Sequence, residues 1–198
     1  MKLLKLLFPV FLTLSFSAGL SLAGEPLSSE LNGDQLTDLF YQAHPQVSMA
    51  REGIEKAFAF YADHRAQFSN HKVITIVDYS QADDVKRLHV IKMESGLPLE
   101  NYFAAHGQGF RHSLPSGVET IVGPYRTGPS IFWGTRKLRY SLKLDFFQDG
   151  SYHRTGLEFH SATYALTGHT QGCVGVLPRD FHPVGDVIEG ESFLYIHR

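Results

Sequence analysis

The only cysteine of the chain, Cys173, ends the run Gly168-His169-Thr170-Gln171-Gly172-Cys173. A lone cysteine has no internal disulfide partner, so in an exported protein it is a candidate reactive thiol. A nucleophilic thiol needs a histidine to take its proton and backbone N–H groups to hold the oxyanion. His160, thirteen residues earlier, and His169, four residues earlier, could each supply the imidazole. The sequence does not decide between them.

Glycines surround the cysteine at positions 168, 172 and 175. Glycine lets the backbone turn tightly and approach a ligand closely. Successive N–H groups, such as those of Gly172 and Cys173, can then point at one oxygen. A free thiol has a pKa of about 8.5, and an adjacent imidazole would help to ionise it. A buried, inert cysteine is the alternative interpretation.

A zinc site is another alternative, with His160, His169 and Cys173 as three ligands. Their spacing matches no common zinc pattern, and the chain has no Cys-x-x-Cys or His-Glu-x-x-His motif. The segment His106-Gly107-Gln108-Gly109 is rich in glycine, but it lacks the lysine and the following helix of a phosphate-binding loop. These patterns disfavour a zinc site and a phosphate-binding loop.

Residues 1–23 are typical of a secretory signal peptide, with early lysines, a short apolar stretch and a cleavage-site pattern at Ser21-Leu22-Ala23. Pro9 interrupts the apolar stretch, which disfavours a membrane anchor. Residues 24–33 are predicted to be a polar linker. The sequence therefore predicts a protein exported to the periplasm or cell envelope. About 175 residues would remain after cleavage, enough for one domain.

The formal net charge is −2, and loss of the two lysines in the signal would make it −4. The basic residues form no run or cluster. This distribution argues against nucleic acid and anionic membrane surfaces as main partners.

Apolar residues at helical spacing predict two helices within residues 34–70. The first follows a possible N-cap at Asp34 and ends before Pro45, and the second covers about residues 48–68. Strand patterns follow, at residues 72–79, 87–93, 99–106, 120–127, 138–146, 156–160 and 192–197. Asp149-Gly150 is a hairpin signal. Helices followed by short strands predict an α+β domain that is mainly an antiparallel β-sandwich, here over residues 71–198.

Four segments carry a resemblance to a known family. They are ITIVDYSQADDVKRLHVIKMESG, FAAHGQG, ETIVGPYRTG and EFHSATYALTGHTQGC. In their order and motifs they resemble the murein L,D-transpeptidase catalytic domain family, a branch of the YkuD-type L,D-transpeptidases. The resemblance extends over roughly residues 50–198. It implies a sandwich of the L,D-transpeptidase type behind N-terminal helices.

The resemblance also implies roles for individual residues. Cys173 matches the nucleophile, and His160 matches the base. Ser161 matches the residue whose backbone carbonyl orients that imidazole, and Gly172 with Cys173 matches the oxyanion donors. Substrate contacts are expected from nearby polar and aromatic side chains, namely Thr170, Gln171, His169, Tyr164, Tyr125 and His106. Thr170 replaces the usual serine, and Gly175 stands where many YkuD-type proteins carry arginine.

Enzymes of this family act on the peptide stems of peptidoglycan, and they need no cofactor. The resemblance implies that the thiol attacks the carbonyl at the L-centre of the third stem residue and releases D-alanine. Transfer of the acyl group to an amine would give a 3→3 cross-link, and transfer to water would make the protein an L,D-carboxypeptidase. A domain that binds peptidoglycan without chemistry is a further alternative.

Overall fold

The computed structural model describes residues 31–93, 98–114, 117–133 and 138–198. The predicted signal peptide and residues 24–30 of the linker lie outside these ranges. The helices are α1 (Gly33–Ala43), α2 (Arg51–His64) and α3 (Pro178–Ile188), with a 3₁₀ turn η1 (Arg65–Gln67). The strands are β1 (Asn70–Asp78), β2 (Leu88–Lys92), β3 (Pro98–Tyr102), β4 (Ala104–Ala105), β5 (Phe110–Arg111), β6 (Thr120–Ile121), β7 (Gly123–Trp133), β8 (Leu138–Gln148), β9 (Ser151–Ser161), β10 (Val174–Val176) and β11 (Ser192–His197).

The first helix begins with a capping box. The Asn32 side chain accepts a hydrogen bond from the Gln35 N–H at 2.9 Å, and the Gln35 side chain accepts one from the Asn32 N–H at 3.0 Å. Both amides would otherwise lack intrahelical partners. The cap is therefore Asn32, and the prediction of Asp34 was wrong. The second helix is shorter than predicted, because α2 gives way to η1 after His64 and the chain is extended at Phe68.

Nine strands form one sheet in the order β3-β2-β1-β11-β7-β8-β9-β10-β4, and β5 and β6 form a small second one. Most neighbours in the large sheet are antiparallel, whereas β1 with β11 and β9 with β10 are parallel. The α+β class and the mainly antiparallel pairing are thus confirmed. Asp149 and Gly150 join β8 to β9 as predicted, both at positive φ (51° and 81°), as a two-residue hairpin turn requires.

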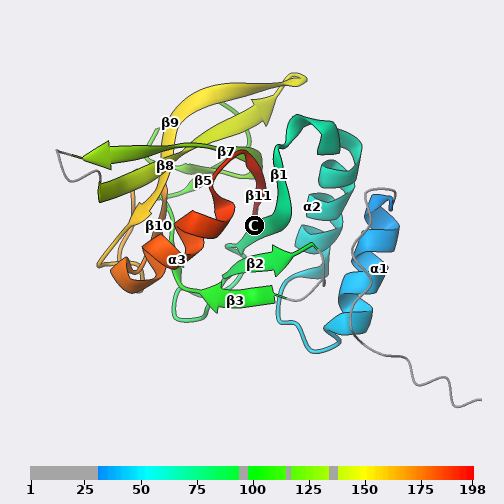
Figure 1. Cartoon of the computed structure of the whole chain (residues 1–198). Coiled ribbons are helices and arrows are strands. Elements are labelled where there is room, and N and C mark those ends of the chain that lie inside the picture. Colours follow the sequence, from blue (N-terminus) through cyan, green and yellow to red (C-terminus); the bar gives the residue numbers. More distant parts are fainter. Residues whose placement is uncertain (1–30, 94–97, 115–116, 134–137) are drawn as a thin grey trace, which may run out of the picture.

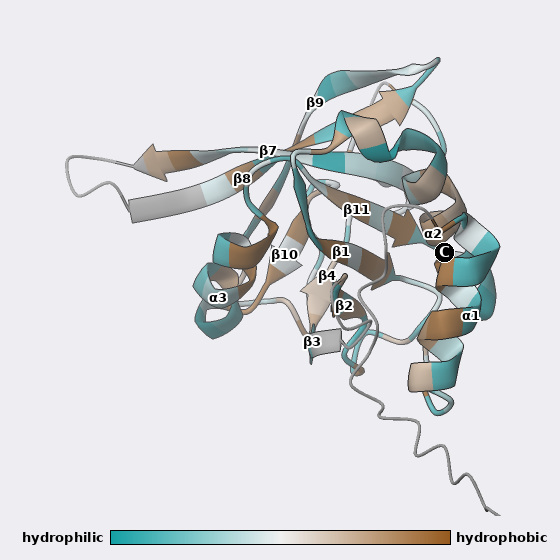
Figure 2. Cartoon of the chain, turned by 45° about the vertical axis from the view of Figure 1, so that its right-hand side comes forward, coloured by the Kyte–Doolittle hydropathy of each residue, from teal (hydrophilic) through white to brown (hydrophobic). Residues whose placement is uncertain are grey.

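The sheet separates two hydrophobic cores. Helices α1 and α2 cover one face of β1 and β11, with α1 outside α2 (Figure 1). On the other face, strands from both halves of the sheet surround a second core, and α3 contacts both β1 and β9. Strand β9 is mostly hydrophilic away from this core (Figure 2). The sheet therefore encloses its main core around α3 and leaves part of β9 accessible.

Helix α3 and strand β10 were not predicted. Helix α3 has Pro178 in its first turn, where proline fits, but it also contains Pro183, which removes a backbone donor. Its buried residues Phe181, Val184 and Ile188 keep helical spacing and face the core. Burial of this stripe outweighs the loss of one hydrogen bond. No helix in the described ranges is both long and apolar enough to cross a bilayer.

Candidate active site

Cys173 lies directly before β10, next to β9. The parallel pairing of the two strands places Val174 beside Phe159 and Gly175 beside His160. Val174 and Phe159 are fully buried, whereas His160 and Cys173 are half-buried. Among the histidines considered from sequence, the tertiary structure therefore brings His160 to the strand that adjoins the thiol.

The His160 imidazole is oriented by the backbone carbonyl of the next residue, Ser161. Its Nδ1 lies 2.8 Å from the carbonyl oxygen of Ser161. A carbonyl oxygen can only accept, so Nδ1 carries the hydrogen of the bond, and in the neutral ring Nε2 is then the acceptor. In the described part of the chain, no hydrogen bond joins His160 Nε2 to Cys173 Sγ. Hydrogen bonds of this kind are often long without substrate and tighten when it binds.

The thiol itself lies in a mixed environment. Burial raises the pKa of Cys173, and a hydrogen bond with the backbone of Glu158 opposes this in part. The Glu158 carboxylate also raises the pKa, while the Lys143 ammonium lowers it. These two side chains form an ion pair of 2.5 Å. Since the net pKa is raised, the thiol is mainly protonated at neutral pH and needs a base to become a nucleophile.

Two threonines hold the loop that carries the cysteine. Thr170 donates from its hydroxyl to the Cys173 carbonyl at 2.6 Å and from its N–H to the His106 carbonyl at 2.7 Å. Thr120 donates to the Gly172 carbonyl at 3.1 Å. In a planar trans peptide, C=O and N–H point in opposite directions. The Cys173 N–H is therefore directed away from Thr120.

Gly172 has a conformation that suits few other residues. Its φ is +94°, and an added Cβ would lie 2.6 Å from the Glu119 carbonyl oxygen. No hydrogen bond from the N–H of Gly172 or of Cys173 is found among the described residues. Two adjacent donors without an internal acceptor are what an oxyanion requires.

The other two histidines near the loop form a separate cluster. The rings of His106 and His169 are 5.0 Å apart, and His106 Nε2 lies 3.6 Å from Asp83 Oδ1. Asp83 also pairs with the buried Arg87 at 2.5 Å. Burial lowers the pKa of His106. This cluster contacts the site through Thr170, whose N–H is bound by the His106 carbonyl.

The remaining predicted substrate contacts lie in different settings. Tyr164 and Gln171 are exposed in the loop between β9 and β10. Tyr125 is fully buried, and its hydroxyl donates to the Ile121 carbonyl at 2.6 Å. Its expected contact with substrate is corrected by the structure, because a side chain enclosed in the core cannot line an open groove.

Sequence reasoning missed three residues that surround the thiol, namely Thr120, Lys143 and Glu158. Alternation along residues 138–146 predicts Lys143 on the face opposite the buried leucines, and the same alternation along β9 places Glu158 opposite Phe159. The pairing of Lys143 with Glu158 is a matter of strand register, which the sequence alone does not supply. No group of three metal-ligating side chains occurs within the described residues.

No family profile and no curated protein matches this sequence. Several solved structures are similar. An L,D-transpeptidase from Mycobacterium smegmatis is 15% identical at a TM-score of 0.42, over 64% of this chain and 59% of its own. L,D-transpeptidase 3 from Mycobacterium tuberculosis is 15% identical at a TM-score of 0.42, and the match covers 64% of this chain and 61% of that protein. The helical cell shape determining protein Pgp2 from Campylobacter jejuni is 14% identical at a TM-score of 0.46, and the match covers 65% of this chain and 48% of that protein.

The matched region thus spans less than two thirds of each of these three proteins. The two mycobacterial proteins carry the name of the family that the sequence motifs resemble.

Proposed function

We propose that this protein is an exported cysteine enzyme that modifies peptidoglycan, with L,D-transpeptidase activity. Cys173 is the nucleophile, and His160 is the base that activates it. The substrate is a peptide stem, and the reacting carbonyl belongs to the L-centre of its third residue, typically diaminopimelate. The orientation of the His160 ring carries the proposal, because Nδ1 on the Ser161 carbonyl leaves Nε2 as the proton acceptor beside the strand of the thiol.

In the first half-reaction, His160 Nε2 takes the thiol proton while Sγ forms a bond to the carbonyl carbon. The negative charge that develops on the carbonyl oxygen is stabilised by the N–H groups of Gly172 and Cys173. The imidazolium then gives its proton to the amine of D-alanine as the carbon–nitrogen bond breaks. A thioester remains on Cys173.

In the second half-reaction, an amine of a neighbouring stem attacks the thioester. His160 takes the proton of this amine, the carbon–sulfur bond breaks, and the thiol is restored with that proton. The product is a 3→3 cross-link. If water replaces the amine, the same steps give an L,D-carboxypeptidase that shortens tetrapeptides to tripeptides. Because burial raises the pKa of Cys173, the thiol has to lose its proton to act as a nucleophile, and His160 is the proposed acceptor in both cases.

The test is incubation of the purified protein with disaccharide-tetrapeptide, followed by mass analysis of the products. A dimer with released D-alanine supports transpeptidation, and a tripeptide supports the carboxypeptidase. A Cys173→Ala variant should release no D-alanine while keeping its thermal unfolding temperature. Release of D-alanine by Cys173→Ala contradicts the proposal. Binding of the tetrapeptide without any product from the unmodified protein favours a peptidoglycan-binding domain instead.

A further inference from the structure

Strand β8 is flanked by an irregularity on each side at the same level. On the β7 side, Thr127 pairs with Leu144 and Ser130 with Leu142, so β7 carries one extra residue. On the β9 side, the partners change from Glu158 opposite Lys143 to Arg154 opposite Asp145, with Gly156 at φ +77°. Bulges bend a strand away from its neighbour. Both neighbours of β8 therefore open near Leu144.

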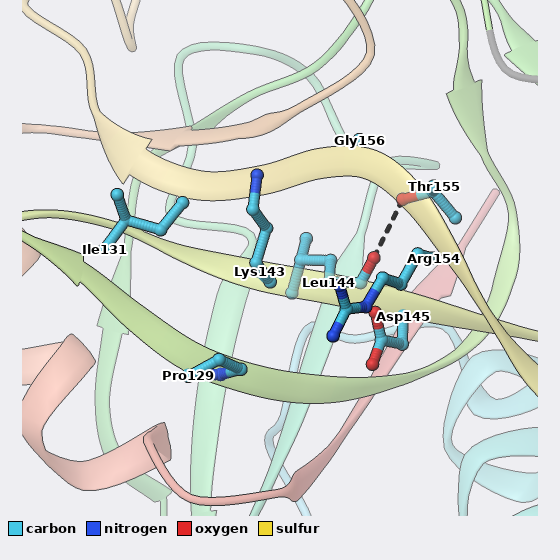
Figure 3. A pocket seen from close by; sticks show the side chains of 8 residues that line it. All are labelled: Pro129, Ile131, Lys143, Leu144, Asp145, Arg154, Thr155 and Gly156. Atoms are coloured by element: carbon cyan, nitrogen blue, oxygen red, sulfur yellow. Dashed lines mark hydrogen bonds between the residues drawn. The ribbon is translucent and has the colours of Figure 1, made fainter.

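A pocket of about 400 Å³ occupies this opening. It is lined by Pro129, Ile131, Lys143, Leu144, Asp145, Arg154, Thr155 and Gly156 (Figure 3). The Thr155 hydroxyl donates to the Leu144 carbonyl at 2.8 Å and accepts from the Leu157 N–H at 2.9 Å, so the bulge is internally bonded. The pocket is therefore a built feature of the sheet.

The charged side chains that line the pocket differ in whether they have an ion-pair partner. Lys143 is paired with Glu158 at 2.5 Å. Asp145 forms an ion pair with Arg126 at 3.7 Å. No ion pair or hydrogen bond of the Arg154 side chain is found within the described residues. Figure 3 shows Arg154 and Asp145 together at one end of the pocket. The Arg154 guanidinium is thus the lining cation without an acceptor of its own among the described residues, and it lies beside the Asp145 carboxylate.

The pocket is connected to the thiol through Lys143. This residue lines the pocket, and its ion-pair partner Glu158 forms a backbone hydrogen bond with the Cys173 thiol. Strand β9 lies between β10 and β8, so the pocket begins at Lys143 about two strand spacings, roughly 10 Å, from the cysteine end of β10. A ligand whose carbonyl reaches Cys173 would place a second group in the pocket only if that group extends across β9.

We propose that this pocket binds a carboxylate of the acyl-donor peptide, with Arg154 as its anchor. The guanidinium fork fits a carboxylate in two parallel hydrogen bonds. The inference rests on the proposed function for the identity of the peptide. A tetrapeptide stem offers two such groups, the side-chain carboxylate of its third residue and the terminal carboxylate of its fourth. Arg154 would make the enzyme select stems in which this group is free rather than amidated.

The experiment measures binding in the Cys173→Ala background, where no turnover interferes. Calorimetry gives the Kd of three probes, namely disaccharide-tetrapeptide, its side-chain carboxamide and its terminal carboxamide. Arg154→Gln should raise the Kd of the free acid about tenfold, as expected for a hydrogen-bonded charge. Arg154→Lys should raise the Kd of the free acid by a smaller factor than Arg154→Gln. Arg179→Gln, an exposed arginine on α3, is the matched control and should change nothing.

Amidation of the bound carboxylate should weaken binding to a similar extent, and Arg154→Gln should add no further loss for that probe. Which probe behaves in this way identifies the carboxylate. Three results would overturn the pocket proposal. They are an unchanged Kd in Arg154→Gln, a rise in Kd of equal size for all three probes in Arg154→Gln, and no binding of the tetrapeptide at all. Binding that depends on Arg154 without D-alanine release by the unmodified protein would overturn only the catalytic proposal.

Discussion

His160 and His106 hold their imidazoles in the same way and differ in what lies at the other nitrogen. In both, Nδ1 is bound to a backbone carbonyl, that of Ser161 at 2.8 Å and that of Gly107 at 2.5 Å. The Nε2 of His106 faces Asp83 at 3.6 Å, whereas the Nε2 of His160 has no hydrogen bond in the described part of the chain.

The surroundings of the two rings sharpen this difference. His106 contacts the rings of Tyr79 and Phe110 at 5.1 and 4.7 Å. Its neighbour Asp83 is itself bound to the buried Arg87. His160 instead lies beside β10 and the thiol. A fixed tautomer alone thus does not make a base, since the second nitrogen must also be available to the reacting group.

The largest expected effect comes from replacing the imidazoles of His160 and His106 one at a time by alanine. His160→Ala should reduce kcat/KM for release of D-alanine on the order of a thousandfold, which is the usual contribution of a general base. His106→Ala should reduce it less than tenfold, because the bond to Thr170 comes from the His106 backbone and, among the described residues, the His106 ring contacts the loop only at His169. Steady-state kinetics on disaccharide-tetrapeptide measures both. His182→Ala, an exposed position on α3, is the control. Equal reductions of kcat/KM in His160→Ala and His106→Ala would contradict the different roles assigned to the two imidazoles.

The next effect concerns the loop that places the thiol. Gly172→Ala should destabilise the protein by roughly 2–4 kcal/mol, since its φ is +94° and the new Cβ would meet the Glu119 carbonyl. Gly150→Ala is the matched control, with φ +81° and no atom within 4 Å of an added Cβ. It should cost about 1 kcal/mol, from the backbone conformation alone. Urea unfolding distinguishes them, and similar losses would show that the close approach at Gly172 is unimportant.

A smaller effect is expected in the pH dependence of stability. Burial lowers the pKa of His106 below the 6.5 of an unfolded chain. Between the two pKa values the unfolded state binds more protons, so stability rises with pH and is lost as the pH falls below about 6.5. His106→Gln should reduce this loss in the free energy of unfolding between pH 7.5 and 5. His112→Gln, at an exposed position, should leave the loss as it is. An unchanged profile in His106→Gln would contradict the buried, neutral imidazole.

The smallest expected effect lies in the titration of the thiol. Alkylation of Cys173 by iodoacetamide should rise at a higher pH than that of free cysteine, because burial raises its pKa. Glu158→Gln should shift this curve to lower pH, and Lys143→Gln should shift it to higher pH, since the carboxylate raises the thiol pKa and the ammonium lowers it. Shifts in the same direction for both variants would show that the ion pair acts by packing rather than by charge.

Local patterns predicted much of the fold. Alternation over residues 138–146 predicted β8, and the β-branched run at 72–79 predicted β1, because a half-buried or buried strand needs these patterns. Boundaries were less accurate. The predicted strand at 120–127 is divided between β6 and β7, which are separated at Val122, and Gly123 at the start of β7 has a positive φ. Helix α3 was missed because Pro178, Pro183 and Gly185 have low helix propensity, which packing in the core overrides.

The candidate site was predicted unevenly. The sequence supplied the candidate nucleophile, the two candidate histidines and the glycine before the thiol, since these depend on residue type and short spacing. Contact with Thr120 and the pairing of Glu158 with Lys143 join residues 15 to 52 positions apart. Such contacts follow from strand order and register, which are not encoded in any local pattern.

The sequence by itself determined that this chain has one cysteine after a glycine, histidines within reach of it, and helices followed by strands. Those properties follow from residue chemistry and from the periodicity of apolar side chains. Only the tertiary structure decided that His160 adjoins the strand of Cys173, that His106 faces Asp83, that Tyr125 is enclosed in the core, and that two bulges open a pocket at Arg154. The physical reason is that the pairing of distant strands, not local spacing, sets which side chains meet.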